Sequence, residues 1–192
     1  MIASLKVRDP MSVEVFLAWE PGDGRQYELV DGLPRAMAPA SIVHGLLQSR
    51  LSRLVGDHLF RHGDRCQIIT APGVIPHVLS GENVRVPDLG VTCAPVVPGQ
   101  QTIVSPVLLI EILSPSNRAE TWSNVWTYTT IPSVQEILVL QSDAIAAHVL
   151  RRDAAGSWPE TPEKTVTGDL VLASISFRVP LTDIYAGIDF GA

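Results

Sequence analysis

The chain contains little lysine, little cysteine and no long apolar run. Of its 14 positively charged residues only Lys6 and Lys164 are lysines, and the other twelve are arginines. No stretch of about 18 uninterrupted apolar residues is present, which argues against a transmembrane helix. The charged residues of the segment 1–10 lead into no apolar stretch, so we do not expect a secretory signal.

The formal charge is −6, which excludes a strongly basic protein that coats nucleic acid. An enzyme that meets DNA through a local basic patch remains compatible with this charge. Cys66 and Cys93 are the only cysteines, and both lie in apolar, strand-like segments. In the absence of a secretory signal we expect a cytoplasmic protein with two buried free thiols and no disulfide.

A length of 192 residues with 46% apolar residues suits a single compact domain spanning the whole chain. Helical spacing of apolar residues is clearest between Ser41 and His62, where Gly63 provides a stop signal. Further helices are expected over 12–17, 119–129 and 181–186. Strand-like runs cover 26–30, 33–38, 66–70, 73–79, 84–93, 107–113, 136–140, 144–150 and 170–179. Polar residues over 156–168 indicate a loop. The pattern predicts a mixed α/β domain with a central sheet flanked by helices.

One carboxylate interrupts the most apolar of these strands. Glu111 is the only charge in the run 107–113, where an ionised carboxylate is costly unless it is paired, protonated or bound to a cation. Asp88 lies 23 positions earlier inside a second apolar stretch, and Glu28 lies in an alternating strand. Successive strands are usually neighbours, so Asp88 and Glu111 are expected to converge on a site for Mg²⁺, Mn²⁺ or Ca²⁺. The alternatives are that Glu28 faces solvent and that Asp88 caps a strand end.

Four short strings give the chain a resemblance to a known family. In order they are 27–32 (YELVDG), 86–89 (VPDL), 111–116 (EILSPS) and 131–136 (IPSVQE). The chain resembles the Uma-type restriction endonucleases of the PD-(D/E)XK nuclease superfamily. The resemblance covers a core over 11–187, behind an N-terminal extension over 1–10.

This resemblance implies a restriction-endonuclease-like fold, a homodimer and Mg²⁺-dependent (or Mn²⁺-dependent) hydrolysis of DNA phosphodiesters. It implies that Asp88 and Glu111 are metal ligands and that Glu28 is an auxiliary acid. The signature lysine is missing, because Leu113 occupies its position and the helix over 119–128 contains no lysine. Asn124 is the nearest polar residue to the place where relatives carry a lysine on that helix, and Arg118 could supply the charge. We therefore count Glu28, Asp88, Glu111 and Asn124 as candidate catalytic residues.

Several aromatic and imidazole side chains have two interpretations, one functional and one structural. His44 could approach the metal site or a phosphate, although a solvated histidine at a helix end is the commoner case. Trp122, Trp126 and Tyr128 could stack on bases, but helical spacing favours a core or dimer-interface role for the two tryptophans.

The sequence leaves three functions open. The leading one is a metal-dependent DNA endonuclease, slowed by the missing lysine, because losing such a group costs about 10²–10³ in rate. The second is a nuclease-like domain that has lost turnover and binds nucleic acid or protein. The third is a metal-dependent phosphoesterase with another substrate, which the negative charge allows.

Overall fold

The computed structural model describes residues 10–63 and 65–191, so nearly all of the expected extension over 1–10 lies outside it. A six-stranded mixed sheet forms the centre, with the order β3-β4-β5-β6-β7-β8. Its strands are β3 (Gln67–Thr70), β4 (Leu89–Thr92), β5 (Pro106–Leu113), β6 (Glu136–Gln141), β7 (Ala147–Arg151) and β8 (Glu163–Thr165). The β5–β6 pair is parallel, and the other pairs of this sheet are antiparallel. The expected mixed α/β architecture is confirmed.

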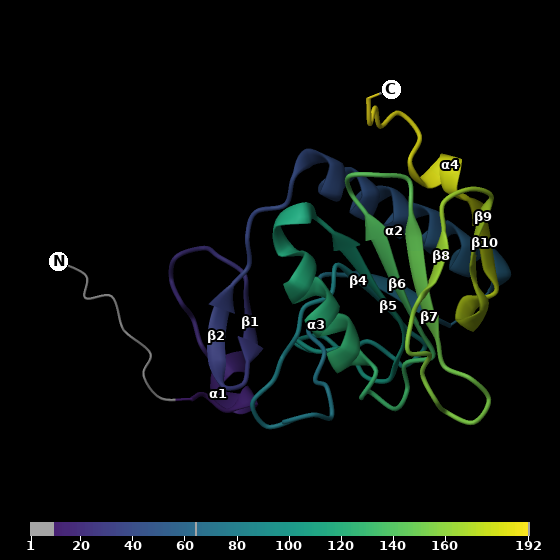
Figure 1. Ribbon diagram of the computed structural model, residues 1–192. Coiled ribbons are helices and arrows are strands. Elements are labelled where there is room, and N and C mark those ends of the chain that lie inside the picture. Colours follow the sequence, from purple (N-terminus) through teal and green to yellow (C-terminus); the bar gives the residue numbers. More distant parts are fainter. Residues whose placement is uncertain (1–9, 64, 192) are drawn as a thin grey trace.

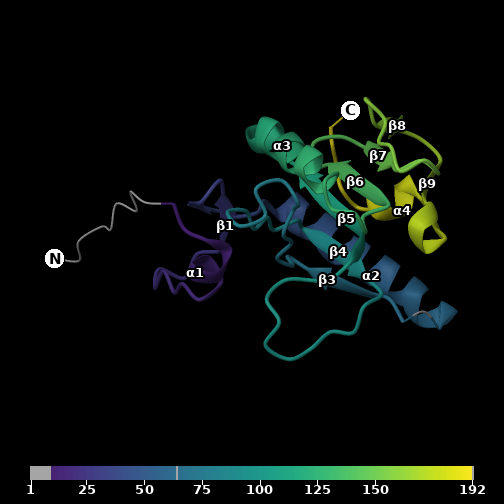
Figure 2. The same ribbon diagram turned by 90° about the horizontal axis from the view of Figure 1, so that it is seen from below.

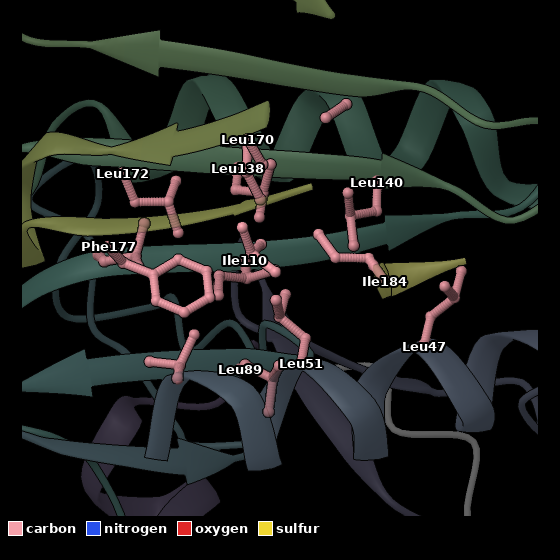
Figure 3. Packing of buried hydrophobic residues seen from close by; sticks show 14 of the residues in the cluster. Leu47, Leu51, Leu89, Ile110, Leu138, Leu140, Leu170, Leu172, Phe177 and Ile184 are labelled. Atoms are coloured by element: carbon pink, nitrogen blue, oxygen red, sulfur yellow. The ribbon is translucent and has the colours of Figure 1, made fainter. Parts of the chain in front are cut away.

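Helices cover both faces of this sheet (Figures 1 and 2). On one face lies α3 (Arg118–Tyr128), which enters through the 3-10 turn Pro115–Asn117 and connects β5 to β6. The other face is covered by α2 (Ile42–His62), by the hairpin of β9 (Asp169–Leu172) and β10 (Phe177–Pro180), and by α4 (Leu181–Ile184). Figure 3 shows leucines of α2 and of the β9–β10 region meeting Ile110 and Leu138 on that face.

The long helix α2 forms where its sequence signals place it. The side chain of Ser41 accepts a hydrogen bond from His44 N at 3.2 Å, and Gly63 ends the helix with a φ of 65°. One stripe of apolar side chains is buried against the sheet, consisting of Leu47, Leu51, Val55 and Leu59. Burial of this stripe holds the helix, since propensity alone would leave it marginal.

A smaller layer precedes the sheet in the chain. It consists of α1 (Val13–Leu17) and a hairpin of β1 (Tyr27–Val30) and β2 (Leu33–Ala36). The hairpin turns at Asp31 and Gly32, whose φ angles of 49° and 77° suit a tight two-residue turn. Backbone hydrogen bonds between Leu29 and Val84, at 2.8 and 3.0 Å, connect this layer to the segment leading into β4.

Several expected strands are shorter than the pattern indicates. The run 73–79 forms only isolated bridges, at Gly73 and Val74, and the run 84–93 is a strand only over β4. The expected strand 170–179 is instead the β9–β10 hairpin, folded around a 3-10 turn, and the expected loop 156–168 contains β8. Alternation alone does not distinguish a ladder from an extended segment, because the ladder also needs a partner in register.

The expectation of two buried free thiols is wrong. Cys66 and Cys93 form a disulfide, and Cys93 is exposed. In the β3–β4 pair Gln67 lies opposite Thr92, so the next residues along the same antiparallel register are the two cysteines. The pairing depends on this register, which compartment and composition do not reveal. Across residues 10–63 and 65–191, no helix has both the length and the apolar character to cross a bilayer.

Candidate metal centre

The two acids expected to share a metal lie opposite each other. In the antiparallel β4–β5 ladder Leu89 pairs with Ile110 and Gly90 with Leu109, so one further step places Asp88 opposite Glu111. Asp88 comes directly before β4. Glu111 lies on β5, and the residues two positions to either side of it, Leu109 and Leu113, pack with Val125 and Tyr128 of α3 in a cluster that we call the α3-side core. Both carboxylates therefore reach the same end of the sheet.

Asp88 is held on both its carboxylate and its carbonyl. Its Oδ2 accepts a hydrogen bond from Ile112 N at 2.6 Å, and its Oδ1 lies 3.1 Å from His44 Nε2. Its carbonyl oxygen accepts from Gln48 Nε2 and from Ala71 N, both at 2.9 Å. These contacts fix the carboxylate toward β5, and they leave its side chain only 13% exposed.

Glu111 is buried, with 7% of its surface exposed, and its Oε1 accepts a hydrogen bond from Tyr128 Oη at 2.6 Å. Burial raises the pKa of Glu111 well above its usual value, and the negative charge of Asp88 raises it further. Burial and the neighbouring Glu111 also raise the pKa of Tyr128 well above its usual value, so this phenol keeps its proton. Two acids this close are stable in their charged form only beside a cation or with a bound proton.

Glu28 is buried rather than solvent-facing. Its Oε1 accepts a hydrogen bond from Arg35 Nε at 3.0 Å, and a longer contact of 3.4 Å joins Asn124 Nδ2 to its Oε2. Burial raises the pKa of Glu28, while Arg35 and then Arg85 oppose that rise. Glu28, Asp88, Glu111 and Asn124 thus belong to one region, which we call the acidic region. Helix α3 connects its parts, because it carries both Asn124, which contacts Glu28, and Tyr128, which donates a hydrogen bond to Glu111.

Arginines supply the positive charge near these acids. Arg85 is buried and donates through Nη1 to Leu29 O at 2.7 Å, while its Nε has no hydrogen-bond partner among the described residues. Burial lowers the pKa of Arg85, whereas the charge of Glu28 raises it. The sequence offers Arg118 as a substitute for the charge of the missing lysine. Its side chain is half-exposed, and its Nη2 lies 3.8 Å from Asp143 Oδ2 rather than beside the acids.

The donor set suits a partly open cation site. Within the described part of the chain, no three His, Cys, Asp or Glu side chains gather in a group able to hold a metal ion. Mg²⁺ does not need such a cage, because it commonly binds one or two carboxylates and completes its shell with water and substrate phosphate. The adjacent Asp88 and Glu111, one of them with a strongly raised pKa, fit that kind of site.

Sequence reasoning missed three contributors to this region. A two-residue turn at 31–32 places Arg35 opposite Glu28 in the hairpin, so that pair was available from register alone. The sequence offers Tyr128 as a base-stacking candidate, but its side chain is fully buried and donates a hydrogen bond to Glu111. Arg85 carried no signal beyond being a charge in an apolar stretch. The interpretation of His44 as a solvated residue at a helix end is wrong. Its side chain is only 13% exposed and contacts Asp88.

The two tryptophans of α3 lie outside the acidic region. Trp122 packs against the α3-side core and edge-on to His148, with ring centroids 5.7 Å apart. Trp126 is 40% exposed, so it is not part of the core.

Comparisons with known proteins identify the family and the fold of the chain. A family model, Uma2, described as "Putative restriction endonuclease", matches residues 13–180. The chain is 30% identical over 182 residues to "Uncharacterized protein slr1290" of Synechocystis sp., with 94% of each chain covered. The crystal structure of "a putative nuclease belonging to DUF820" from Anabaena variabilis has the same fold. Its TM-score is 0.74 at 15% identity, covering 92% of this chain and 98% of that one. The resemblance seen in the four sequence strings is confirmed, and the chain belongs to the Uma2 family.

Proposed function

We propose that the protein is a divalent-metal-dependent nuclease that hydrolyses phosphodiester bonds in DNA. The observation that carries the proposal is the juxtaposition of Asp88 and Glu111 at one end of a buried sheet, with a raised pKa on Glu111. Family membership supports the same reaction class. The resemblance also favours a homodimer, whose two sites would cut both strands.

Asp88 and Glu111 would hold Mg²⁺ or Mn²⁺, which when bound polarises a phosphoryl oxygen and acidifies a water. The protein's own groups prepare that position. The Ile112 N–H and His44 orient the Asp88 carboxylate, and the Tyr128 hydroxyl orients that of Glu111. Each carboxylate is therefore positioned before substrate arrives, which reduces the reorganisation needed during the reaction.

Glu28 and Asn124 form the auxiliary part of the site. The Asn124 amide can orient a water molecule, and Glu28 can accept its proton, because burial raises the pKa of this carboxyl above its usual value. Asn124 brings no positive charge to the developing phosphorane. Arg35 and Arg85 neutralise Glu28 rather than facing the Asp88–Glu111 pair directly.

The protein is expected to cut DNA only with a divalent ion. Purified protein incubated with supercoiled and linear DNA should show cleavage in Mg²⁺ or Mn²⁺ and none in EDTA. Metal binding to the folded state alone should also raise the melting temperature of the protein. A parent protein that neither cleaves DNA nor melts higher in either ion would contradict the proposal.

Replacing Asn124 with lysine is expected to speed cleavage by roughly 10²–10³, the usual worth of one such charged group. Asn124 is almost buried and already contacts Glu28 Oε2, so the new ammonium would have a carboxylate partner. Single-turnover rates on one linear substrate measure the gain. Asn124→Met is the matched control of similar length without charge, and equal rates for the two variants would refute the role assigned to this position.

One observation favours a second candidate, a domain that binds nucleic acid without turnover. The signature position is occupied by Leu113, which is buried in the α3-side core and cannot reach a phosphate. Retention of DNA binding by a protein that melts higher in Mg²⁺ yet never cleaves would support this candidate. Cleavage by Asn124→Lys but not by the parent would show that the missing cation is the reason.

A further inference from the structure

An open pocket of about 360 Å³ lies between α1, the start of β1 and the turn after β3. Its volume falls in the range of about 300–1,000 Å³ that small-molecule pockets occupy. Three aromatic rings line one side. The rings of Trp19 and Tyr27 meet edge-on with their centroids 4.9 Å apart, and the ring centroids of Phe16 and Trp19 are 6.2 Å apart.

Two of these rings are not part of a hydrophobic core. The small core of the α1–hairpin layer consists of Val13, Leu29 and Val84, and Phe16 packs against it. Trp19 and Tyr27 are only partly buried and lie outside that cluster. Both rings are held at the pocket wall, because Trp19 packs against Phe16 and Tyr27 and the Tyr27 hydroxyl donates to Asp23 Oδ2 at 2.7 Å, and both remain partly exposed.

The pocket wall is joined to the candidate metal centre through the backbone, although Glu28, Asp88 and Glu111 do not line the pocket. Tyr27 immediately precedes Glu28 on β1, and the wall residue Ala71 donates its N–H to the Asp88 carbonyl at 2.9 Å. Val86, another wall residue, lies two positions before Asp88. Successive side chains of a strand point to opposite faces, so Tyr27 faces the pocket while Glu28 points to the other side of β1, and the two sites are connected by chain rather than by a shared surface.

Polar side chains at the same pocket are of the kind that recognise nucleotides. Arg25, Gln26 and Gln101 line it, and glutamine amides can pair with base edges. Arg25 Nε lies 3.9 Å from Asp23 Oδ2, and the Arg25 side chain is 67% exposed, so this surface pairing is too weak to prevent contact with a phosphate. Aromatic faces that accept any base by stacking complete the set.

We propose that this pocket binds the base of an unpaired nucleotide of a nucleic-acid strand. A base within a duplex has both faces stacked and can enter only after unstacking, which disfavours paired DNA. The inference adds a substrate class to the proposed function: single-stranded DNA or unpaired positions within a duplex. Cleavage of such a substrate rests on that proposed function, whereas base binding does not.

Binding measured in EDTA tests the pocket without turnover. Fluorescence anisotropy of a labelled single-stranded oligonucleotide should give tighter binding than the matched duplex, and an oligonucleotide with abasic positions should bind more weakly. Trp19→Ala should weaken single-strand binding roughly 5- to 150-fold, the loss of one stacked base. Trp19→Phe should recover most of it, and Trp126→Ala, which removes an exposed ring on α3, should bind as the parent does.

Equal affinity for single strand and duplex, or unchanged binding by Trp19→Ala, would overturn the inference. So would an equal loss in Trp19→Ala and Trp126→Ala. Melting curves show whether the Trp19→Ala protein folds. If it does not, the inference is tested by the parent protein alone, and equal binding of intact and abasic oligonucleotides would overturn it. Base-dependent binding without metal-dependent cleavage would support the pocket while refuting the nuclease, and the reverse result would do the opposite.

Discussion

Asp88→Asn is expected to abolish metal-dependent DNA cleavage while leaving the protein folded. The amide keeps the shape of the carboxylate and can still accept from Ile112 N, but it removes the charge that a cation requires. A metal contributes several kcal/mol of transition-state stabilisation, so the rate should fall by roughly 10³ or more. Single-turnover cleavage at saturating protein, in Mg²⁺ and in Mn²⁺, measures this loss.

Glu111→Gln should lose cleavage equally but should differ in stability. Burial and Asp88 raise the pKa of Glu111, so its ionisation costs stability as pH rises from the ordinary carboxyl pKa through the raised one. In EDTA at pH 8 the glutamine variant should therefore melt above the parent, while near pH 4 the two should melt alike. Each 1 kcal/mol gained corresponds to about 2–4 °C for a chain of this size.

Three results would count against this account of the metal centre. Cleavage by Asp88→Asn at the parent rate would show that the acid pair is not the reactive site. Nicking that is equal in the parent and both variants would indicate a contaminating nuclease. A Glu111→Gln protein that melts below the parent in EDTA at pH 8 would show that the buried carboxylate is not a destabilising charge.

Glu136→Ala is expected to cause the largest loss of stability. Glu136 is 1% exposed on β6, and its carboxylate accepts from Ala173 N at 3.0 Å, Ser174 N at 2.6 Å and Arg151 Nε at 2.7 Å. Alanine would leave two backbone donors without their acceptor and would detach the turn between β9 and β10 from the sheet. An unpaired donor costs about 1–3 kcal/mol when it is buried, and these two are partly buried, so the free energy of unfolding should fall by roughly 2–4 kcal/mol.

Thermal or urea denaturation measures that loss, which corresponds to a fall in melting temperature of about 4–16 °C. Glu163→Ala is the matched control, because Glu163 also pairs with Arg151, at 3.5 Å, but is largely exposed. Its cost should stay below about 1 kcal/mol. Equal destabilisation by the two substitutions would mean that the backbone hydrogen bonds of Glu136 contribute little.

The parts of the fold that the sequence predicts well are those controlled by local chemistry. Ser41 and Gly63 bound α2 because a hydroxyl cap and a left-handed glycine act within one turn of the helix. Glu111 stands out because a single charge in a long apolar run is costly wherever the strand pairs. These signals need no knowledge of which segments become neighbours.

The parts that the sequence does not predict depend on long-range register. The Cys66–Cys93 disulfide, the short β8 and the reduction of 73–79 to isolated bridges all follow from which strand lies beside which. The same holds for Arg85, whose approach to Glu28 requires the β1–β2 hairpin to lie against the segment before β4. Composition and periodicity describe each segment separately, so they carry no information on these pairings.

The segment from β5 through α3 to β6 brings Glu111, Asn124 and Tyr128 into the molecule on one continuous stretch of chain. The aromatic pocket, by contrast, is lined largely by the N-terminal layer and by neighbouring loops. In the proposed function, Glu111 and Asn124 are thus carried by a different stretch of the polypeptide from the pocket, while Glu28 lies on β1 next to the pocket residue Tyr27. Substitutions at Trp19, which precedes β1, are therefore the ones expected to change selectivity for nucleic acid without altering a proposed catalytic residue.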